Sequence, residues 1–315
     1  MKNKELRVLF VSSGNSKKGI SPIVKNQGET LKENGIDISW FTIKGKGIKG
    51  YLKNISVLRK IIITNNYDLI HAHYSMSAYI TSLASLGMRV PIVCSLMGSD
   101  IQTNKFNKLI INFFYRYLWK RTIVKSERMK THICLKNTKV IPNGVNLLQF
   151  NKIEKNKAQD LLGFDKNKKN IIWVSNPKRY EKNYKLALNA INFLKTDTIK
   201  LNIVNGVDYQ DIPKYMYAAD LLILTSLWEG SPNVIKEAMA CNCPIVSTDV
   251  GDVRWIIGNT IGCFITLFDS QDVANNIQKV LNNGTRTNGR ERIITLGLDS
   301  VTIAKKIIKI YNEVL

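Results

Sequence analysis

Strand-like and helix-like runs alternate along almost the whole of this 315-residue chain, and this alternation constrains its fold more than any other feature. Short apolar runs at residues 6–12, 170–175 and 221–225 are each followed by a loop and then by a segment with helical periodicity. Strands that alternate with helices predict parallel sheets covered by helices on both faces. The chain is therefore expected to be an α/β protein.

The alternation falls into two series, and a Lys/Asn-rich polar stretch at residues 151–157 and 166–170 separates them. A chain of this length is long enough for two domains. We expect an N-terminal domain over residues 1–150 and a C-terminal domain over residues 151–300, each doubly wound. Residues 301–314 have apolar side chains at a helical period and predict a final helix whose apolar face must be buried.

The charge of the chain is unevenly distributed. Lysine and arginine number 46 against 24 acidic residues, a net charge of +22. Residues 1–150 hold 24 basic and 7 acidic residues, whereas residues 151–315 hold 22 and 17. An AT-rich genome explains abundant lysine and asparagine, but it does not explain why acids are missing from one half only. A single-signed half predicts an anionic partner surface.

Other bulk features exclude several classes. No apolar run is long enough to cross a bilayer, and the short apolar run near the N-terminus is interpreted as a strand rather than a signal peptide, so a cytoplasmic location is predicted. The five cysteines are odd in number and without pattern, which favours buried thiols over disulfides. Cys241 and Cys243 have no further cysteine or histidine cluster nearby, so no metal site is expected.

Residues 229–251, EGSPNVIKEAMACNCPIVSTDVG, hold the most specific pattern. Ser231 is a preferred N-cap and Pro232 a preferred first helical residue, so a helix is expected to begin there. Its free N–H groups would lie after the strand at 221–225 and form an anion site, for which phosphate is the usual ligand.

Glu229 and Glu237 flank this helix start with seven residues between them. Carboxylates in these positions are badly placed to touch phosphate, but they can accept hydrogen bonds from the hydroxyl groups of the same ligand. Nucleotide sugars have that form, with hydroxyls at both ends and a pyrophosphate between them.

This segment resembles the E-x7-E signature of retaining glycosyltransferases of family 4, which have the GT-B fold. The resemblance implies two doubly wound parallel-sheet domains that face each other across a cleft, with the last helix, within residues 301–315, packed back onto the first domain. It also implies a nucleoside diphosphate sugar of UDP or GDP type as donor substrate and no other cofactor.

The resemblance assigns roles within the C-terminal domain. Residues 174–183 correspond to the phosphate clamp of the family, where Lys182 matches the second basic position and Pro177 stands at the first, so Arg179 or Lys178 must supply that charge. Arg179 and Lys182 are expected to hold the diphosphate. At the helix start, the resemblance implies that Ser231, Asn233 and Val234 contact the phosphates. It implies that Glu237 binds the ribose and that Glu229 lies near the donor sugar.

In the N-terminal domain, the loop after the first strand contains Gly14 and Gly19, and the family has a glycine-rich loop here close to the donor phosphates. Lys17 and Lys18 make an anion contact plausible in that loop. His71 and His73 end a strand and point to the same side, because strand side chains alternate. A proton-transfer role is expected for His73, and a buried structural histidine is the alternative.

Two further segments match the family. Residues 95–100 resemble its T-x-H-G-x-D pattern, but Met97 stands at the histidine position, so a relative that binds donor with reduced turnover stays open. His73 could partly replace that histidine. Residues 141–145, IPNGV, match the interdomain crossover of the family.

Residues 105–121 interleave aromatic and basic side chains. Such a helix lies either at a membrane surface or in the core with a basic outer face. The uneven charge favours peripheral association with the inner face of the plasma membrane.

The function that we expect is that of a retaining hexosyltransferase, which moves a sugar from a nucleoside diphosphate sugar to a glycan or lipid-linked acceptor in cell-surface polysaccharide assembly. No Asp-x-Asp pair ends a strand, so a metal-independent reaction is predicted. Two alternatives remain. One is a sugar-nucleotide epimerase of the same fold. The other is a basic nucleic-acid-binding protein, although the sequence has no nucleic-acid-binding motif and no nucleic acid partner is expected.

Overall fold

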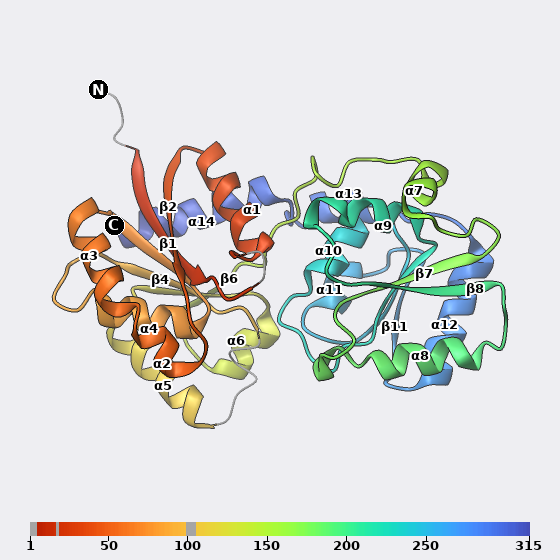
Figure 1. Cartoon of the computed structure of the whole chain (residues 1–315), viewed down its shortest axis with the longest axis horizontal. Coiled ribbons are helices and arrows are strands. Elements are labelled where there is room, and N and C mark those ends of the chain that lie inside the picture. The colour runs from red at the N-terminus through yellow and green to blue at the C-terminus, as the bar shows by residue number, and fades with distance from the viewer. Residues whose placement is uncertain (1–4, 17–18, 99–104) are drawn as a thin grey trace. The chain divides into compact units, whose positions relative to one another are not determined.

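The computed structural model describes residues 5–16, 19–98 and 105–315, and these form two compact units (Figure 1). Unit 1 comprises Met1–Gly144 and Ser300–Leu315, and unit 2 comprises Val145–Asp299. The division lies after Gly144, whereas the polar composition of the sequence placed it at residue 150. The last helix belongs to unit 1.

Unit 1 contains a six-stranded parallel sheet in the order β2-β1-β3-β4-β5-β6. Its order reverses beside β1, because the chain first adds β2 on one side and then continues with β3 on the other. The strands are β1 (Leu6–Ser13), β2 (Ile36–Ile43), β3 (Leu69–His73), β4 (Ile92–Ser95), β5 (Arg121–Val124) and β6 (Thr138–Val140). Every residue of β3 and β4 is buried, as expected of central strands with helices on both faces.

The helices of unit 1 form two layers. α1 (Pro22–Glu33) packs against α14 (Ser300–Val314). On another side, α4 packs against three neighbours and makes one layer with them. That layer is α2 (Gly47–Leu52), α3 (Ile55–Asn65), α4 (Ser75–Ala84) and α5 (Lys105–Tyr117), and α6 (Glu127–Ile133) follows β5.

α5 ends earlier than the aromatic-basic pattern predicted. The pattern extends over residues 105–121, but the helix stops at Tyr117. Trp119 is buried, and its indole N–H donates to Ser82 Oγ at 3.0 Å. The Lys120 N–H donates to the carbonyl of Ile92 at 2.9 Å, so the backbone has already turned toward the sheet.

Unit 2 contains a five-stranded parallel sheet in the order β11-β10-β9-β7-β8. The order reverses between β7 and β9, which are neighbours in the sheet. The strands are β7 (Lys169–Val174), β8 (Ile199–Val204), β9 (Leu221–Leu224), β10 (Ile245–Thr248) and β11 (Cys263–Thr266). Both sheets are parallel and doubly wound, which confirms the predicted α/β class.

Helices also cover both faces of this second sheet (Figure 1). α8 packs against α12 on one side, and α10 contacts α9, α11 and α13 on the other. The helices are α7 (Lys155–Leu162), α8 (Tyr184–Phe193), α9 (Ile212–Ala218), α10 (Asn233–Ala240), α11 (Val253–Ile257), α12 (Ser270–Asn283) and α13 (Gly289–Thr295), with 3-10 turns η1 (Tyr180–Lys182) and η2 (Tyr209–Asp211).

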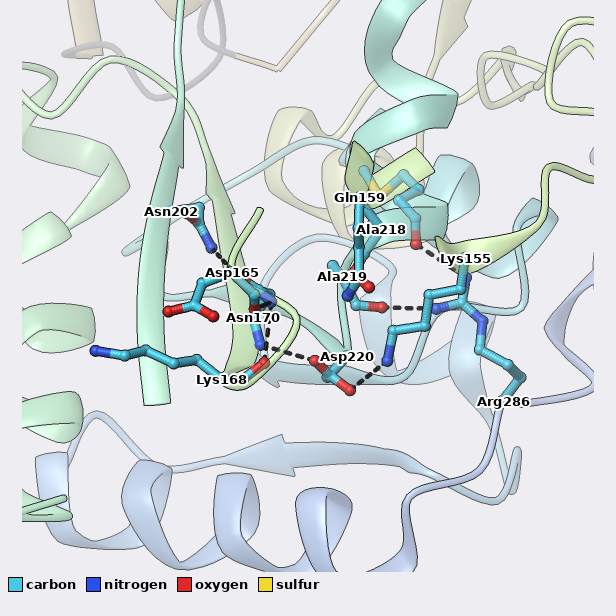
Figure 2. A network of polar contacts seen from close by, with 11 residues as sticks. Lys155, Gln159, Asp165, Lys168, Asn170, Asn202, Ala218, Ala219, Asp220 and Arg286 are labelled. Carbon is cyan, nitrogen blue, oxygen red and sulfur yellow. Dashed lines mark hydrogen bonds and ion pairs between the residues drawn. The ribbon is translucent and has the colours of Figure 1, made fainter. Parts of the chain in front are cut away.

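A polar network fixes the amino ends of β7 and β9 (Figure 2). Asp220, directly before β9, accepts from the Asn170 N–H at 2.7 Å and from Lys155 Nζ at 2.6 Å. The Asn170 side chain donates to the carbonyl of Asp165 at 2.8 Å. Arg286 donates to the carbonyl of Ala219 at 2.8 Å. The network attaches α7 and the loop after it to the amino ends of β7 and β9. The candidate site lies at the carboxyl ends of the same strands.

Candidate active site

The carboxyl ends of β7 and β9 meet where the strand order of unit 2 reverses. In open α/β sheets, ligands bind beyond the carboxyl ends of strands at such a switch point. Residues 175–183 follow β7 and residues 225–232 follow β9, so the two most specific motifs of the sequence lie side by side. Unit 1 has its own switch point between β1 and β3, where Gly14 and His73 are found.

α10 begins one residue later than its sequence predicted. Its first residue is Asn233, and Pro232, with φ −68° and ψ 119°, is the N-cap. The Ser231 hydroxyl does not cap the helix, because it accepts a hydrogen bond from Lys236 Nζ at 2.9 Å. The amides of Asn233 and Val234 open the helix and, like those of any first turn, have no partner within it. The start of α10 can therefore still bind an anion, but the prediction that Ser231 is the N-cap of the helix is wrong.

Glu229 is held at the end of the loop that follows β9. Its Oε1 atom forms an ion pair with Lys182 Nζ and accepts a hydrogen bond from Ser226 Oγ at 2.8 Å. Both charged side chains are only about one-sixth exposed, at 16% for Glu229 and 15% for Lys182. The pair directly joins the signature loop to the predicted phosphate clamp.

The backbone fixes the same junction. Thr225 Oγ1 donates to the carbonyl of Lys182 at 3.1 Å and accepts from the buried Trp173 indole N–H at 3.1 Å. The Leu227 N–H donates to the carbonyl of Glu181 at 2.8 Å. Lys182 is consequently positioned by main-chain contacts as well as by its ion pair.

Arg179 is placed differently from Lys182. Its guanidinium pairs with the Glu181 carboxylate, with Nε at 2.7 Å from Oε1, and its side chain is 54% exposed. This arginine and the backbone N–H of Glu181 both lower the pKa of that carboxyl group, although burial opposes them. The expected contact of Arg179 with a diphosphate stays a prediction.

Glu237 lies in the second turn of α10 and is buried. Its Oε1 atom accepts a hydrogen bond from the Tyr209 hydroxyl at 3.0 Å. Burial raises the pKa of Glu237 to about 7, against the opposing effects of Tyr209 and of the Lys236 ammonium group. Its charge therefore changes near neutral pH. The ionised carboxylate can only accept hydrogen bonds, whereas the protonated group also donates one.

Lys236 is a member of this site that the sequence analysis did not identify. Its side chain is 1% exposed, and burial lowers its pKa to about 8, although Asp252 and Glu237 both raise it. Burial also raises the pKa of Asp252, which lies in the loop after β10. No local pattern marks a buried lysine, because the acid that compensates it lies at Asp252, on a different loop.

The glycines of the signature permit this close packing of loops. Gly251 has φ +58°, and a Cβ atom there would lie 2.7 Å from the carbonyl oxygen of Gly230. The loops after β9 and β10 can therefore approach only if residue 251 lacks a side chain.

In unit 1, His71 and His73 are both buried at the end of β3. His71 Nδ1 lies 2.6 Å from the Tyr311 hydroxyl of α14, and Nε2 lies 2.8 Å from Ser95 Oγ. His73 stacks on the His71 ring, with centroids 4.3 Å apart, and within the described part of the chain neither of its ring nitrogens has a hydrogen-bond partner. Burial lowers the pKa of both rings, and nearby Lys125 adds to the effect.

These histidines are therefore neutral near pH 7. A neutral imidazole can accept a proton, so the expected proton-transfer role of His73 stays a prediction, although its ring is only 2% exposed. The sequence placed the two rings on one side of a strand, and their stacking agrees with that. The sequence did not indicate the hydrogen bond between His71 and Tyr311.

The glycine loop of unit 1 is described only in part. Gly14 packs against the end of β2, where a Cβ atom would lie 2.8 Å from Thr42 Cβ, and Gly19 has φ +74°. Lys17 and Lys18 of this loop, and Asp100 at the end of the 95–100 segment, lie outside the described residues. Met97 follows β4 and is partly buried.

The cysteines and the lengths of the helices bear on two further expectations. All five cysteines are free, as predicted, and Cys94, Cys241 and Cys243 are buried, whereas Cys134 is exposed. Of the helices formed by the described residues, none is both long and apolar enough to cross a bilayer.

Two family profiles match the chain. The profile described as "Glycosyl transferase 4-like" matches residues 4–126, in unit 1, and the profile described as "Glycosyl transferases group 1" matches residues 198–283, in unit 2. The second match contains the whole of the segment from Glu229 to Gly251.

Curated relatives agree with these profiles. TuaC of Bacillus subtilis (strain 168), a glycosyltransferase provisionally assigned by name to teichuronic acid biosynthesis, is 30% identical over 61% of this chain and 55% of its own length. The chain thus matches about half of that relative. An Escherichia coli protein named UDP-Gal:alpha-D-GlcNAc-diphosphoundecaprenol alpha-1,3-galactosyltransferase is 24% identical over 83% of this chain and 79% of its own length.

Solved structures share the fold. Sucrose-phosphate synthase of Thermosynechococcus elongatus has a TM-score of 0.86 at 16% identity and covers 98% of both chains. The Anabaena protein Alr3699/HepE, solved with UDP and glucose, has a TM-score of 0.76 at 20% identity and covers 98% of this chain and 100% of its own. These likenesses show a GT-B fold. The two profiles, which match residues 4–126 and 198–283, show that the chain belongs to the family 4-like, group 1 glycosyltransferases.

Proposed function

We propose that this protein is a retaining, metal-independent hexosyltransferase. It takes the sugar from a nucleoside diphosphate sugar, most simply a UDP-sugar, and transfers it to a glycan or lipid-linked acceptor in cell-surface polysaccharide assembly. A cytoplasmic location on the inner face of the plasma membrane completes the proposal. Family membership supports the general reaction, and the site supports the donor.

One observation carries the proposal: Lys182 and Glu229 form an ion pair at the switch point of unit 2, beside the start of α10. A lysine, two free amides and a helix dipole at one sheet edge form a site for a diphosphate. The carboxylates of Glu229 and Glu237 supply acceptors for hydroxyl groups on either side of it.

The ion pair suggests how the donor is received. A diphosphate that enters the site competes with Glu229 for Lys182, because both are anions. When Lys182 turns to the phosphate, Glu229 keeps its bond from Ser226 and gains free capacity to accept from sugar hydroxyls. Charge that builds on the leaving diphosphate is then stabilised by Lys182 and by the amides of Asn233 and Val234.

The UDP assignment rests on relatives. The Escherichia coli relative is named for a UDP-galactose donor and a diphosphoundecaprenol-linked acceptor. The Anabaena structure contains UDP and glucose. A GDP donor is the nearest alternative, since the described contacts involve ribose- and phosphate-binding groups rather than a base.

An exposed apolar surface on unit 1 supports the proposal of a lipid-linked acceptor. Leu109, Phe113 and Tyr117, here called the α5 stripe, lie one helical turn apart and are 67%, 56% and 66% exposed. α2, α3, α4 and α5 contain no acidic residue at all. Exposed aliphatic and aromatic side chains on a basic, acid-free layer fit an anionic lipid surface better than a nucleic acid, which offers no apolar layer to aliphatic side chains.

The decisive experiment incubates the purified protein with a panel of UDP- and GDP-sugars, with and without undecaprenyl-diphosphate-linked sugars, and follows products by mass spectrometry. Glycosyl transfer predicts nucleoside diphosphate release that depends on the acceptor, whereas an epimerase would convert the donor without one. The anomeric configuration of the product tests retention. Undiminished activity in EDTA tests metal independence, and a requirement for a divalent ion would overturn it.

A further inference from the structure

The η2 turn places Tyr209 against the helix that carries Glu237. The chain passes from β8 through this single 3-10 turn into α9, so the turn lies beyond the carboxyl end of β8. Tyr209 is partly buried, and its hydroxyl donates to Glu237 Oε1 at 3.0 Å. One carboxylate oxygen is thus occupied by the protein itself, and Oε2 is left for another donor.

Tyr209 is held firmly from its other side. Its ring meets the fully buried ring of Phe150 edge to face, with centroids 6.0 Å apart. Gln149 Nε2 donates to the Tyr209 carbonyl at 3.0 Å. Arg290 in turn donates to the carbonyls of Phe150 and Ala240, at 2.6 and 3.0 Å, and so fixes Phe150 to the end of α10. The hydroxyl and its acceptor are therefore held on one rigid frame.

We propose that Tyr209 is a positioning residue for donor binding: its hydroxyl fixes the orientation of the Glu237 carboxylate, so that Oε2 accepts hydrogen bonds from the ribose of the nucleotide. This inference rests on the proposed function, because it requires a nucleotide at Glu237. Nothing in the resemblance to the family assigns a role to this tyrosine.

The chemistry follows from what each group can do. A phenol donates one hydrogen bond, and a bond to the charged form of a carboxylic acid favours that form. Ribose hydroxyls are better held by a carboxylate than by a carboxylic acid, because charge-assisted hydrogen bonds are the stronger ones. The ionisable groups that interact with Glu237 are Tyr209, the neighbouring Lys236 and the buried Cys241 thiol, and Asp252 in turn interacts with Lys236.

The test measures UDP binding by calorimetry from pH 6 to pH 9 for the wild type and for Tyr209→Phe. Loss of the hydroxyl is expected to raise the midpoint of the binding profile by about one pH unit, so that Kd increases about fivefold at pH 7 but less than twofold at pH 9. A tyrosine that only supports the fold would change Kd by the same factor at every pH. Lys236 is present in both proteins, so its own titration cancels in the ratio.

Three further variants secure the interpretation. Tyr215→Phe, the same change in α9, should leave the profile unaltered. Tyr209→Phe in a Glu237→Gln background should have no pH-dependent effect, because an amide does not titrate. Gln149→Leu, which loosens the tyrosine without removing it, should move the midpoint in the same direction by less, and it serves if Tyr209→Phe fails to fold.

The outcomes separate the two proposals. A wild type that binds neither UDP nor GDP at any pH would overturn the proposed function. A wild type that binds UDP, with a Tyr209→Phe to wild-type Kd ratio that is flat across pH, would overturn the role of Tyr209 alone.

Discussion

The two units differ most in their net charge. Unit 1 holds 27 basic and 8 acidic residues, a net of +19, whereas unit 2 holds 19 and 16, a net of +3. Both come from one gene, so a genome-wide bias toward lysine cannot explain a difference that lies mainly in the acids. Unit 2 places several of its acids in the site and in the network around Asp220, whereas helices α2 to α5 of unit 1 contain none.

The contrast extends to buried and exposed groups. In unit 2, Lys236 is compensated by Asp252 and Glu237, and Lys182 by Glu229. In unit 1, apolar side chains are exposed on the acid-free layer, at Ile48, Leu52, Val57, Ile63, Leu109, Phe113 and Tyr117. Under the proposed function, unit 2 binds a compact anion in a specific site, whereas unit 1 presents a broad surface.

The strongest test removes the cation of the unit 2 site. Lys182→Ala deprives the leaving diphosphate of its charge partner and leaves Glu229 unpaired, so kcat/KM is expected to fall about 10²- to 10³-fold. Steady-state kinetics with the donor that proves active measures this. Lys185→Ala on α8 is the matched control, and an equal loss there would show that position-specific charge is not responsible.

A second test concerns the polar network around Asp220, at the amino ends of β7 and β9. Asp220→Ala removes the acceptor of the Asn170 N–H and the partner of Lys155, and it should lower the free energy of unfolding by about 2–3 kcal/mol. Urea unfolding followed by fluorescence measures the change. Asp249→Ala breaks an exposed pair with Arg254 and should cost less than about 1 kcal/mol. Equal costs would mean that burial of the network does not matter.

The third test moves to unit 1. Replacing the α5 stripe by serine (Leu109→Ser, Phe113→Ser, Tyr117→Ser) should weaken binding to phosphatidylglycerol-containing vesicles about 30-fold, because the buried apolar area is lost. Co-sedimentation measures the partition, and UDP binding should be unchanged. Leu188→Ser with Phe193→Ser, on α8 of unit 2, should have no effect. Binding that survives in the α5 variant would assign the membrane contact elsewhere or to charge alone.

The smallest expected effect is a pH dependence of the wild type. The pKa of Glu237 is raised to about 7, so the group is protonated below that pH and ionised above it. UDP affinity should therefore increase about tenfold between pH 6 and pH 8, in proportion to the ionised fraction. Calorimetry across this range provides the measurement, with Glu237→Gln as the non-titrating control. An affinity that falls as the pH rises would contradict the role of an ionised carboxylate.

Much of this arrangement could be predicted from the sequence. Strand and helix alternation is local, since it depends on side-chain periodicity over a few residues, and it predicted most of the elements around the site. The pairing of Glu229 and Glu237 around a helix start is likewise contained in one segment. The start itself was misplaced, because Ser231 has the chemistry of a cap and only packing shows that Lys236 already holds it.

The sequence by itself determined the class of fold, the two-part organisation and the acidic pair, because these depend on short-range spacing and on composition. Only the tertiary structure decided which groups meet. Lys182 reaches Glu229 across 47 residues, Tyr209 reaches Glu237 across 28, and His71 reaches Tyr311 across 240. Such partners are selected by the packing of strands and helices, and a buried charge or hydroxyl is stable only where that packing supplies its counterpart.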